Sequence, residues 1–382
     1  MATPPGSSRP ARYGWYVSEP AVTERLFHET AAENSLRAAE RLSADAWARL
    51  QEHPEKFRVL TGERPTGPLH LGHYFGSLQR RVEVQSYGVQ TWLLLADYQA
   101  LTDRPGSVDL QASMADIVLD YIAVGLDVQS DRGLAFRHSQ VPELNQLLLP
   151  FLSLVSVSEI ERNPTVKSEI ETLGSGHVTG LMFNYPVHQA ADILFCHGNL
   201  VPGGRDQLPH VEITRKIART FNKTYSPRRR YFQEPVLLFG EAPLLLGTDG
   251  KKMGKSARNA VFIRDDEATT AAVLKKAVTD SDPHIAYDPV NRPTVANLLL
   301  LGALAAGTTP EAVADEIGPG GSARLKAYVT EAVNEHFRPI RARRAELAAD
   351  PEIVKSVLER GNEIARQTAR RTLREVHELM HL

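Results

Sequence analysis

Short apolar runs alternate with helix-length amphipathic segments over the middle of this chain, and this alternation limits the fold more than any other feature. The run TWLLLA at residues 91–96 is almost continuously apolar, which is typical of a strand covered on both faces of a sheet. Similar strands are predicted at 57–61, 133–137 and 236–239, with helical patterns between them at about 70, 108–124, 142–155, 186–197 and 206–222. The alternation predicts an α/β fold with a doubly wound, parallel, Rossmann-like sheet. Ligands of such sheets bind beyond the carboxyl ends of the strands.

The strand signals end near residue 260, and the chain divides into three predicted parts. Residues 1–55 form an N-terminal extension, with a flexible tail to about residue 18 followed by helix. Residues 56–260 form the Rossmann-type domain. Residues 261–382 form an all-helical domain, because helical patterns continue there at 328–347 and 353–379. We expect the last helices to pack back on the Rossmann-type domain.

The composition excludes several classes of protein. The 382 residues can bury a substantial core, and a net charge of −2 argues against a protein that coats long nucleic-acid duplexes. The single cysteine, Cys196, excludes an intramolecular disulfide framework and a cysteine-rich zinc site. The longest apolar run, at 298–306, is too short to span a bilayer, and the first residues lack an uninterrupted apolar signal segment. We therefore predict a cytoplasmic protein with no membrane partner.

The segment PTGPLHLGHY, at residues 65–74, is predicted to bind nucleotide phosphates. Gly67 and Gly72 let the backbone approach a ligand without a Cβ in the way. A helix that starts near His70 offers unpaired N–H groups and a partial positive charge to an anion. His70 and His73, three residues apart, share one face of that helix and can donate to phosphate oxygens.

A second segment, KKMGKS at residues 251–256, makes a flexible cationic loop preceded by Gly250. Such a loop can close on pyrophosphate and stabilise its developing charge. We interpret Lys251 as a solvated surface charge. The two segments, in this order, resemble the HIGH and KMSKS signatures of class I aminoacyl-tRNA synthetases. Lys252 and Lys255 match that motif, whereas Gly254 stands where the family usually has serine.

This resemblance implies a catalytic reaction in which an amino-acid carboxylate attacks the α-phosphorus of ATP and pyrophosphate leaves. Orientation and electrostatic stabilisation are sufficient for this chemistry, with Mg²⁺ carried by the ATP phosphates and no metal held by the protein itself. The implied catalytic residues are His70, His73, Lys252 and Lys255. The implied ATP-binding residues are Thr66, Gly67, Gly72, Gly204, Asp206, Lys252, Met253, Lys255 and Ser256.

Residues 180–222 look like the substrate pocket of tryptophanyl-tRNA synthetases, of a divergent bacterial type. The resemblance implies that Asp192, on a helix with a Tyr-Pro start, accepts the indole N–H, because a buried carboxylate would be left unpaired by other side chains. His188, one turn earlier, is either a cation paired with Asp192 or a pocket-lining residue. The implied tryptophan-binding residues are Arg64, Gln99, Tyr185, Gln189, Asp192, Val201 and Gln207.

The family forms homodimers, so the resemblance implies a homodimer that binds L-tryptophan, ATP and tRNA(Trp), with the helical domain contacting the tRNA anticodon region. Arginine clusters at 228–230, 341–344 and 370–371 are candidates for RNA phosphate contacts. Four alternatives remain open. These are the tyrosine-specific relative, a synthetase-like adenylating enzyme of a specialised pathway, a nucleotidylyltransferase without an RNA substrate, and a synthetase-like binding protein that has lost catalysis.

Overall fold

The computed structural model describes residues 31–102, 109–173, 178–240, 242, 244–255 and 257–382. Its centre is a five-stranded sheet in the order β3-β2-β1-β4-β5. All four neighbouring pairs are parallel. The strands are β1 (Arg58–Glu63), β2 (Gln90–Leu95), β3 (Gly133–Arg137), β4 (Leu200–Gly203) and β5 (Val236–Phe239). The predicted Rossmann-like fold class is confirmed. The predicted tail over residues 1 to about 18 lies outside the described residues.

The order in which successive strands are added to the sheet reverses between β1 and β4, so the topological switch point lies near the centre of the sheet. β3 and β5 have the predicted bounds, and β1 and β2 are displaced by one or two residues. β4 was not predicted, because it has four residues and ends in Pro-Gly, which normally indicates a turn. It is nevertheless buried along its whole length and pairs with both β1 and β5.

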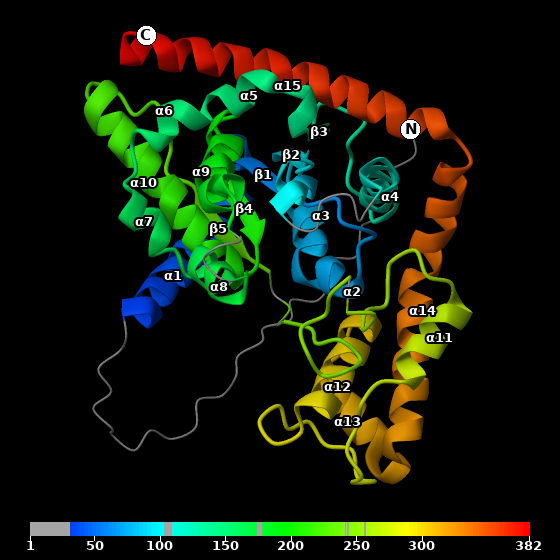
Figure 1. Cartoon of the computed structure of the whole chain (residues 1–382). Coiled ribbons are helices and arrows are strands. Elements are labelled where there is room, and N and C mark those ends of the chain that lie inside the picture. The colour runs from blue at the N-terminus through cyan, green and yellow to red at the C-terminus, as the bar shows by residue number, and fades with distance from the viewer. Residues whose placement is uncertain (1–30, 103–108, 174–177, 241, 243, 256) are drawn as a thin grey trace.

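Helices cover both faces of the sheet (Figure 1). One core cluster lies on the side of α4, and another lies on the side of α9 and α10. The helices that surround the sheet are α1 (Ala31–Glu52), α2 (Leu71–His73), α3 (Gln79–Ser86), α4 (Leu110–Ala123), α5 (Pro142–Gln146), α6 (Leu148–Leu152), α7 (Val157–Glu161), α8 (Pro164–Leu173), α9 (Gly180–Leu194) and α10 (Leu208–Tyr225). A π-helical turn over Tyr74–Leu78 joins α2 to α3.

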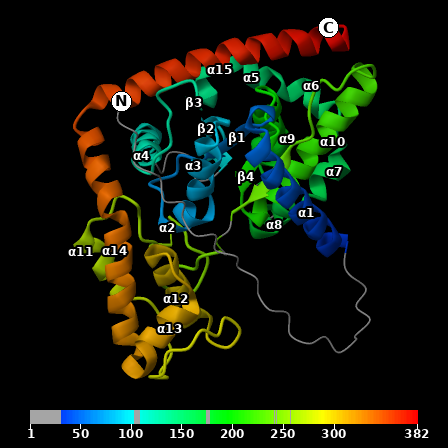
Figure 2. The ribbon, with the colours of Figure 1, turned by 180° about the vertical axis from the view of Figure 1, so that it is seen from behind.

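The segment after the lysine loop is helical, as predicted from the loss of strand signals. The helices α11 (Glu267–Lys275), α12 (Pro293–Ala306), α13 (Pro310–Ile317) and α14 (Gly321–Ala348) pack together beside the sheet. Helix α15 (Pro351–Met380) then turns back and runs along the β3 edge (Figures 1 and 2). None of the helices in the described part of the chain is long and apolar enough to cross a membrane.

Helix α15 approaches the edge strand so closely that a glycine is required at the contact. A Cβ on Gly361 would lie 1.9 Å from the carbonyl oxygen of Ala135 in β3. About three turns further along α15, Thr372 Oγ1 donates to the carbonyl of Phe195, at the end of α9, at 2.6 Å. Because the clash at Gly361 is with backbone, it cannot be relieved by a side-chain rotation.

Gly361→Ala is therefore expected to lower the free energy of unfolding by about 2–4 kcal/mol, because α15 must move away from β3. Chemical denaturation followed by circular dichroism measures this change. Gly180→Ala is the matched control, since a Cβ at Gly180, in the first turn of α9, meets nothing within 4 Å. Equal destabilisation by the two substitutions would contradict the close approach of α15 and β3.

Two arginines of the 341–344 cluster make contacts within the protein, and the expected RNA contact of this cluster stays a prediction. Arg344 on α14 donates to Asp120 at 2.6 Å and to Asp116 at 2.7 Å, both on α4. Arg341 donates to Asn334 and Thr270. Asp120 also accepts the backbone N–H of Leu69 at 3.4 Å, directly before His70. The α14–α4 ion pairs thus reach the first phosphate-binding segment.

Candidate active site

The first phosphate-binding segment leaves the carboxyl end of β1 and enters α2 at His70, as the Rossmann topology requires. The backbone N–H of His70 donates to Nδ1 of His73 at 3.1 Å. The two imidazole centroids lie 3.7 Å apart. Because Nδ1 of His73 accepts this hydrogen bond, its neutral ring carries the proton on Nε2. That N–H is available to a ligand oxygen.

Both histidines are neutral at physiological pH. Burial, followed by the positive charges of Lys255 and Lys252, lowers the pKa of His73 to about 3. Burial, the neighbouring His73 and the same two lysines also lower the pKa of His70 to about 3. A neutral pair can act on an anion through hydrogen-bond donation, while the nearby lysines can supply positive charge.

These lowered pKa values predict an acid-sensitive native state. Between about pH 3 and 6.5 the unfolded chain binds protons that native His70 and His73 do not, so stability falls as pH falls through this window. Between pH 7.5 and 5.0, wild type is expected to lose about 2 kcal/mol more stability than His73→Asn, which lacks one of these groups. Denaturant unfolding at the two pH values gives both losses, and identical losses would contradict the prediction.

The lysine loop lies directly against the histidine segment. Lys255 Nζ donates to the carbonyl of Gly67 at 2.9 Å. A Cβ on Gly72 would lie 3.5 Å from Sδ of Met253. The backbones are also joined, because Leu71 N–H donates to Val261 O at 3.0 Å and Ile263 N–H donates to Leu69 O at 2.9 Å. The two segments that resemble HIGH and KMSKS therefore meet at one place.

Asn259, which the sequence interpretation missed, organises the lysine loop. Its side chain is buried, donates to the carbonyl of Lys252 at 3.2 Å and accepts the N–H of Gly254 at 3.0 Å. A Cβ on Gly254 would make only van der Waals contacts, the nearest at 3.9 Å. Gly254 is therefore not required by the space around it. Ser256 of the predicted ATP site lies outside the described residues.

The turn after β4 connects the phosphate side of the site to a polar pocket. Asp206 Oδ2 lies 4.0 Å from Nζ of Lys252, and the adjacent Gln207 accepts a hydrogen bond from Gln189 at 3.1 Å. Gly204 opens this turn, where a Cβ would lie 2.6 Å from Oδ1 of Asp206. Val201 is buried in β4 immediately before it.

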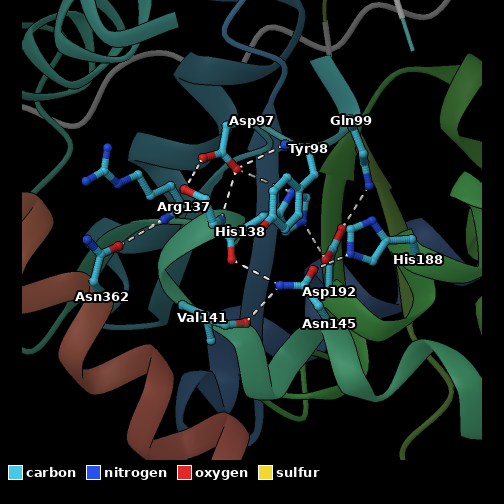
Figure 3. A network of polar contacts seen from close by, with 11 residues as sticks. Asp97, Tyr98, Gln99, Arg137, His138, Val141, Asn145, His188, Asp192 and Asn362 are labelled. Atoms are coloured by element: carbon cyan, nitrogen blue, oxygen red, sulfur yellow. Dashed lines mark hydrogen bonds and ion pairs between the residues drawn. The ribbon is translucent and has the colours of Figure 1, made fainter. Parts of the chain in front are cut away.

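The pocket centres on Asp192 of α9, which is 1% exposed (Figure 3). Gln99 Nε2 donates to one carboxylate oxygen at 3.0 Å, and His138 Nε2 donates to the other at 2.8 Å. Gln99 follows β2 and His138 follows β3, so the carboxyl ends of neighbouring strands supply both donors. The Asp192 side chain points into this buried network and not into solvent.

His138 was not predicted as a site residue, and its position corrects one of the two interpretations of His188. His188 Nε2 bonds to Asn145 Oδ1 at 2.7 Å, and burial lowers its pKa. His188 is therefore a neutral residue of the pocket wall, and the imidazole that bonds Asp192 belongs to His138. The only available signal in the sequence was the place of His138 directly after a predicted strand.

The remaining predicted residues lie around the same two sites. Tyr185 bonds through its hydroxyl to Nε2 of His210 at 3.2 Å. Burial, together with the nearby charge of Arg64, lowers the pKa of His210 to about 4. Arg64 itself is exposed after β1, and its carbonyl accepts the N–H of Thr66 at 2.8 Å. The arginine therefore lies toward the Tyr185 side of the pocket.

Two further features of the structure provide neither a metal site nor an additional part of this site. His138, His188 and Asp192 could offer metal-ligand atoms within 4.8 Å of one another, but the two imidazoles are stacked at 30°. Lone pairs of stacked rings lie in nearly parallel planes, so they do not converge on one ion. A cavity of about 460 Å³ lies elsewhere, between α4 and the α14–α15 junction, and it contains none of the predicted site residues.

Comparison with known proteins agrees with this geometry. The family model for class I tRNA synthetases (W and Y) matches residues 52–338. The chain therefore belongs to the class I aminoacyl-tRNA synthetases, and it is an ATP-dependent ligase.

Individual relatives are named for one amino acid, tryptophan. A tryptophan–tRNA ligase of Clostridium longisporum is 38% identical over 84% of this chain and 95% of its own length. A tryptophan–tRNA ligase of Streptococcus pyogenes serotype M1 is 40% identical over 84% of this chain and 97% of its own. The structure of tryptophanyl-tRNA synthetase from Campylobacter jejuni with ADP and tryptophan is 30% identical, with a TM-score of 0.70, and covers 85% of this chain and 100% of its own.

Proposed function

We propose that this enzyme is a tryptophan–tRNA ligase, which forms tryptophanyl-AMP and pyrophosphate and then transfers tryptophan to tRNA(Trp). The observation that carries the proposal is the position of Asp192, a buried carboxylate held by donors from two strand ends. The turn containing Asp206 and Gln207 connects this pocket to the lysine loop. The relatives named above support tryptophan as the substrate.

In this proposal the two halves of the site hold tryptophan and ATP in a fixed orientation relative to each other. Asp192 accepts the indole N–H, and Tyr185, Gln189, Val201 and Gln207 line the amino-acid side. Arg64 lies near enough for its charge to act on His210, the partner of Tyr185. His70 and His73 donate to ATP phosphate oxygens from the amino end of α2. Lys252 and Lys255 stabilise the charge that develops as pyrophosphate leaves.

Mg²⁺ belongs to the ATP in this proposal and not to a protein cage. The charged groups near the histidine pair include the ammonium groups of Lys252 and Lys255, which do not suit a hard cation that prefers oxygen ligands. The carboxylate of Glu63 is also near His70, but it is paired with Arg81 at 2.8 Å. When bound, Mg²⁺ neutralises phosphate charge. The protein residues supply orientation and hydrogen bonds.

Amino-acid-dependent ATP–pyrophosphate exchange, measured across the twenty amino acids, tests the proposal. Exchange with tryptophan as the preferred substrate is the expected result. The tyrosine-specific relative also has an aspartate on the corresponding helix, so the aspartate alone does not separate the two alternatives. The tyrosine-specific alternative predicts a preference for tyrosine in this assay. Charging of tRNA(Trp) then separates a ligase from an adenylating enzyme that serves a specialised pathway, which would form adenylate without charging tRNA.

We also propose that the enzyme is a homodimer and that its helical part, residues 261–382, contacts the anticodon region of the tRNA. The family resemblance motivates both statements. Sedimentation velocity at micromolar concentration tests the first, and a single species of monomer mass would refute it. A tRNA footprint confined to the acceptor stem would refute the second.

A further inference from the structure

Asp192 receives one side-chain donor on each carboxylate oxygen, from His138 and from Gln99 (Figure 3). All three side chains are buried. Each oxygen of a carboxylate can accept about two hydrogen bonds, so each keeps one acceptor position. The direction of these remaining positions depends on how the two donors hold the carboxylate.

The orientation of the His138 ring is determined by its neighbours. An ionised carboxylate can only accept hydrogen bonds, so Nε2 of His138 carries a hydrogen and donates it in the hydrogen bond to Asp192. The ring stacks on Tyr98 at 6.1 Å and 13°, and on His188 at 4.6 Å and 30°. His138 is therefore held on two faces as well as at its ring nitrogen.

The side-chain amide of Asn145 determines which ring nitrogen of His188 carries a hydrogen. Asn145 Nδ2 donates to the carbonyls of His138 and Val141, at 3.1 and 3.0 Å. The Oδ1 of the same amide must then accept, so Nε2 of His188 is the donor in their 2.7 Å contact. Asn145 thus ties the backbone of His138 to the ring on which His138 stacks.

The backbone on either side of His138 is also anchored. The N–H of Arg137 donates to Asn362 Oδ1 of α15 at 3.1 Å. Ser139 donates to Asp97 through its N–H at 3.2 Å and through Oγ at 2.5 Å. With both neighbours bound, His138 has little freedom to move away from Asp192.

We propose that His138 is a positioning residue that determines specificity, because its Nε2–H holds Asp192 so that the free acceptor positions face the single donor of an indole side chain. The inference rests on the proposed function of Asp192 as the indole acceptor. A substrate without the ring N–H leaves that acceptor unpaired while His138 keeps the carboxylate in place. His138 is therefore expected to control the preference for tryptophan over an isosteric analogue that lacks the donor.

The test compares L-tryptophan with 3-(benzothiophen-3-yl)-L-alanine, in which sulfur replaces the ring N–H, in ATP–pyrophosphate exchange. His138→Phe keeps an aromatic ring between Tyr98 and His188 but removes the donor. It is expected to raise the KM for tryptophan by about 10–100-fold and to reduce the tryptophan/analogue ratio of kcat/KM by a similar factor. The KM for ATP is expected to stay within about 2-fold of wild type, because His138 contacts the pocket side of the site only.

His138→Gln, which retains an N–H donor, is expected to keep the tryptophan/analogue ratio within about 5-fold of wild type. His138→Met, whose flexible side chain fills the space without a donor, provides a second donor-free variant if His138→Phe does not fold. His284→Gln is the control, since His284 is an exposed histidine before α12. Thermal unfolding of each variant identifies those that fold.

A donor-free variant that folds and keeps the wild-type ratio overturns the inference, because His138 would then serve only the stability of the pocket. A loss of kcat with unchanged KM for tryptophan overturns it as well. Failure of the proposed function is seen in wild type itself, as absent exchange with tryptophan or an equal preference for the analogue. The two failures are therefore distinguished by whether they appear before or after His138 is changed.

Discussion

Lys255→Ala is expected to lower kcat for tryptophan-dependent ATP–pyrophosphate exchange by about 10²–10³-fold, with little change in the KM for tryptophan. Lys255 lies against Gly67, and its charge reaches both histidines. An ammonium group placed there stabilises the charge that grows on the leaving pyrophosphate more than the charge of bound ATP. Loss of this ammonium group therefore raises the free energy of the transition state more than that of the bound substrates. Steady-state and single-turnover measurements separate this effect from changes in product release.

Lys251→Ala is the matched control for this change. Lys251 belongs to the same loop and is exposed, and its backbone, not its ammonium group, makes the contacts to Gly247 and Asp249. Its removal is expected to alter kcat by about 2-fold or less, in the manner of an exposed charge. Equal losses in Lys251→Ala and Lys255→Ala would mean that the loop contributes only general positive charge.

Asp192→Ala is expected to lower kcat/KM for tryptophan by at least about 10³-fold. The substitution removes the proposed acceptor of the indole N–H. It also leaves the donors of His138 and Gln99 buried without their partner, which costs free energy in the free enzyme and in the complex. The exchange assay with tryptophan and with its benzothiophene analogue measures both the loss and any change in preference.

Asp131→Asn serves as the control, because Asp131 is fully exposed and pairs only with Arg360 at the surface before β3. Nucleotide-induced stabilisation in a thermal-shift assay is expected to persist in Asp192→Ala, since the phosphate side of the site does not contain this residue. If Asp192→Ala kept its preference for tryptophan over the analogue, Asp192 would not be the group that reads the indole.

The architecture could be predicted from the sequence because the signals for strands and helices lie within short contiguous segments. Continuous apolar runs at 91–96 and 133–137 indicate buried strands without any knowledge of their neighbours. The HIGH-like and KMSKS-like motifs were likewise visible, because their glycines, histidines and lysines are contiguous in the sequence, and phosphate binding by them stays a prediction. The convergence of Lys255 on Gly67, implied only by the resemblance, appears in the structure as a direct contact.

The parts that escaped prediction depend on partners distant in the chain. β4 ends in Pro-Gly, which locally indicates a turn, and it is a strand because β1 and β5 pair with it. His138 carries no motif, and its role follows from Asp192, which is 54 positions later. Arg344 was interpreted only as a candidate RNA contact, because its acidic partners on α4 lie in a different predicted domain. Tertiary pairing decides each of these cases.

Helix α15 comes after the sheet and the other helices in the described part of the chain, yet it covers β3, the edge strand, and anchors the residue before His138. A nascent chain that lacks these 30 residues would leave an open strand available for pairing with other chains. Prematurely terminated products are thus expected to aggregate and to be unable to select their substrate.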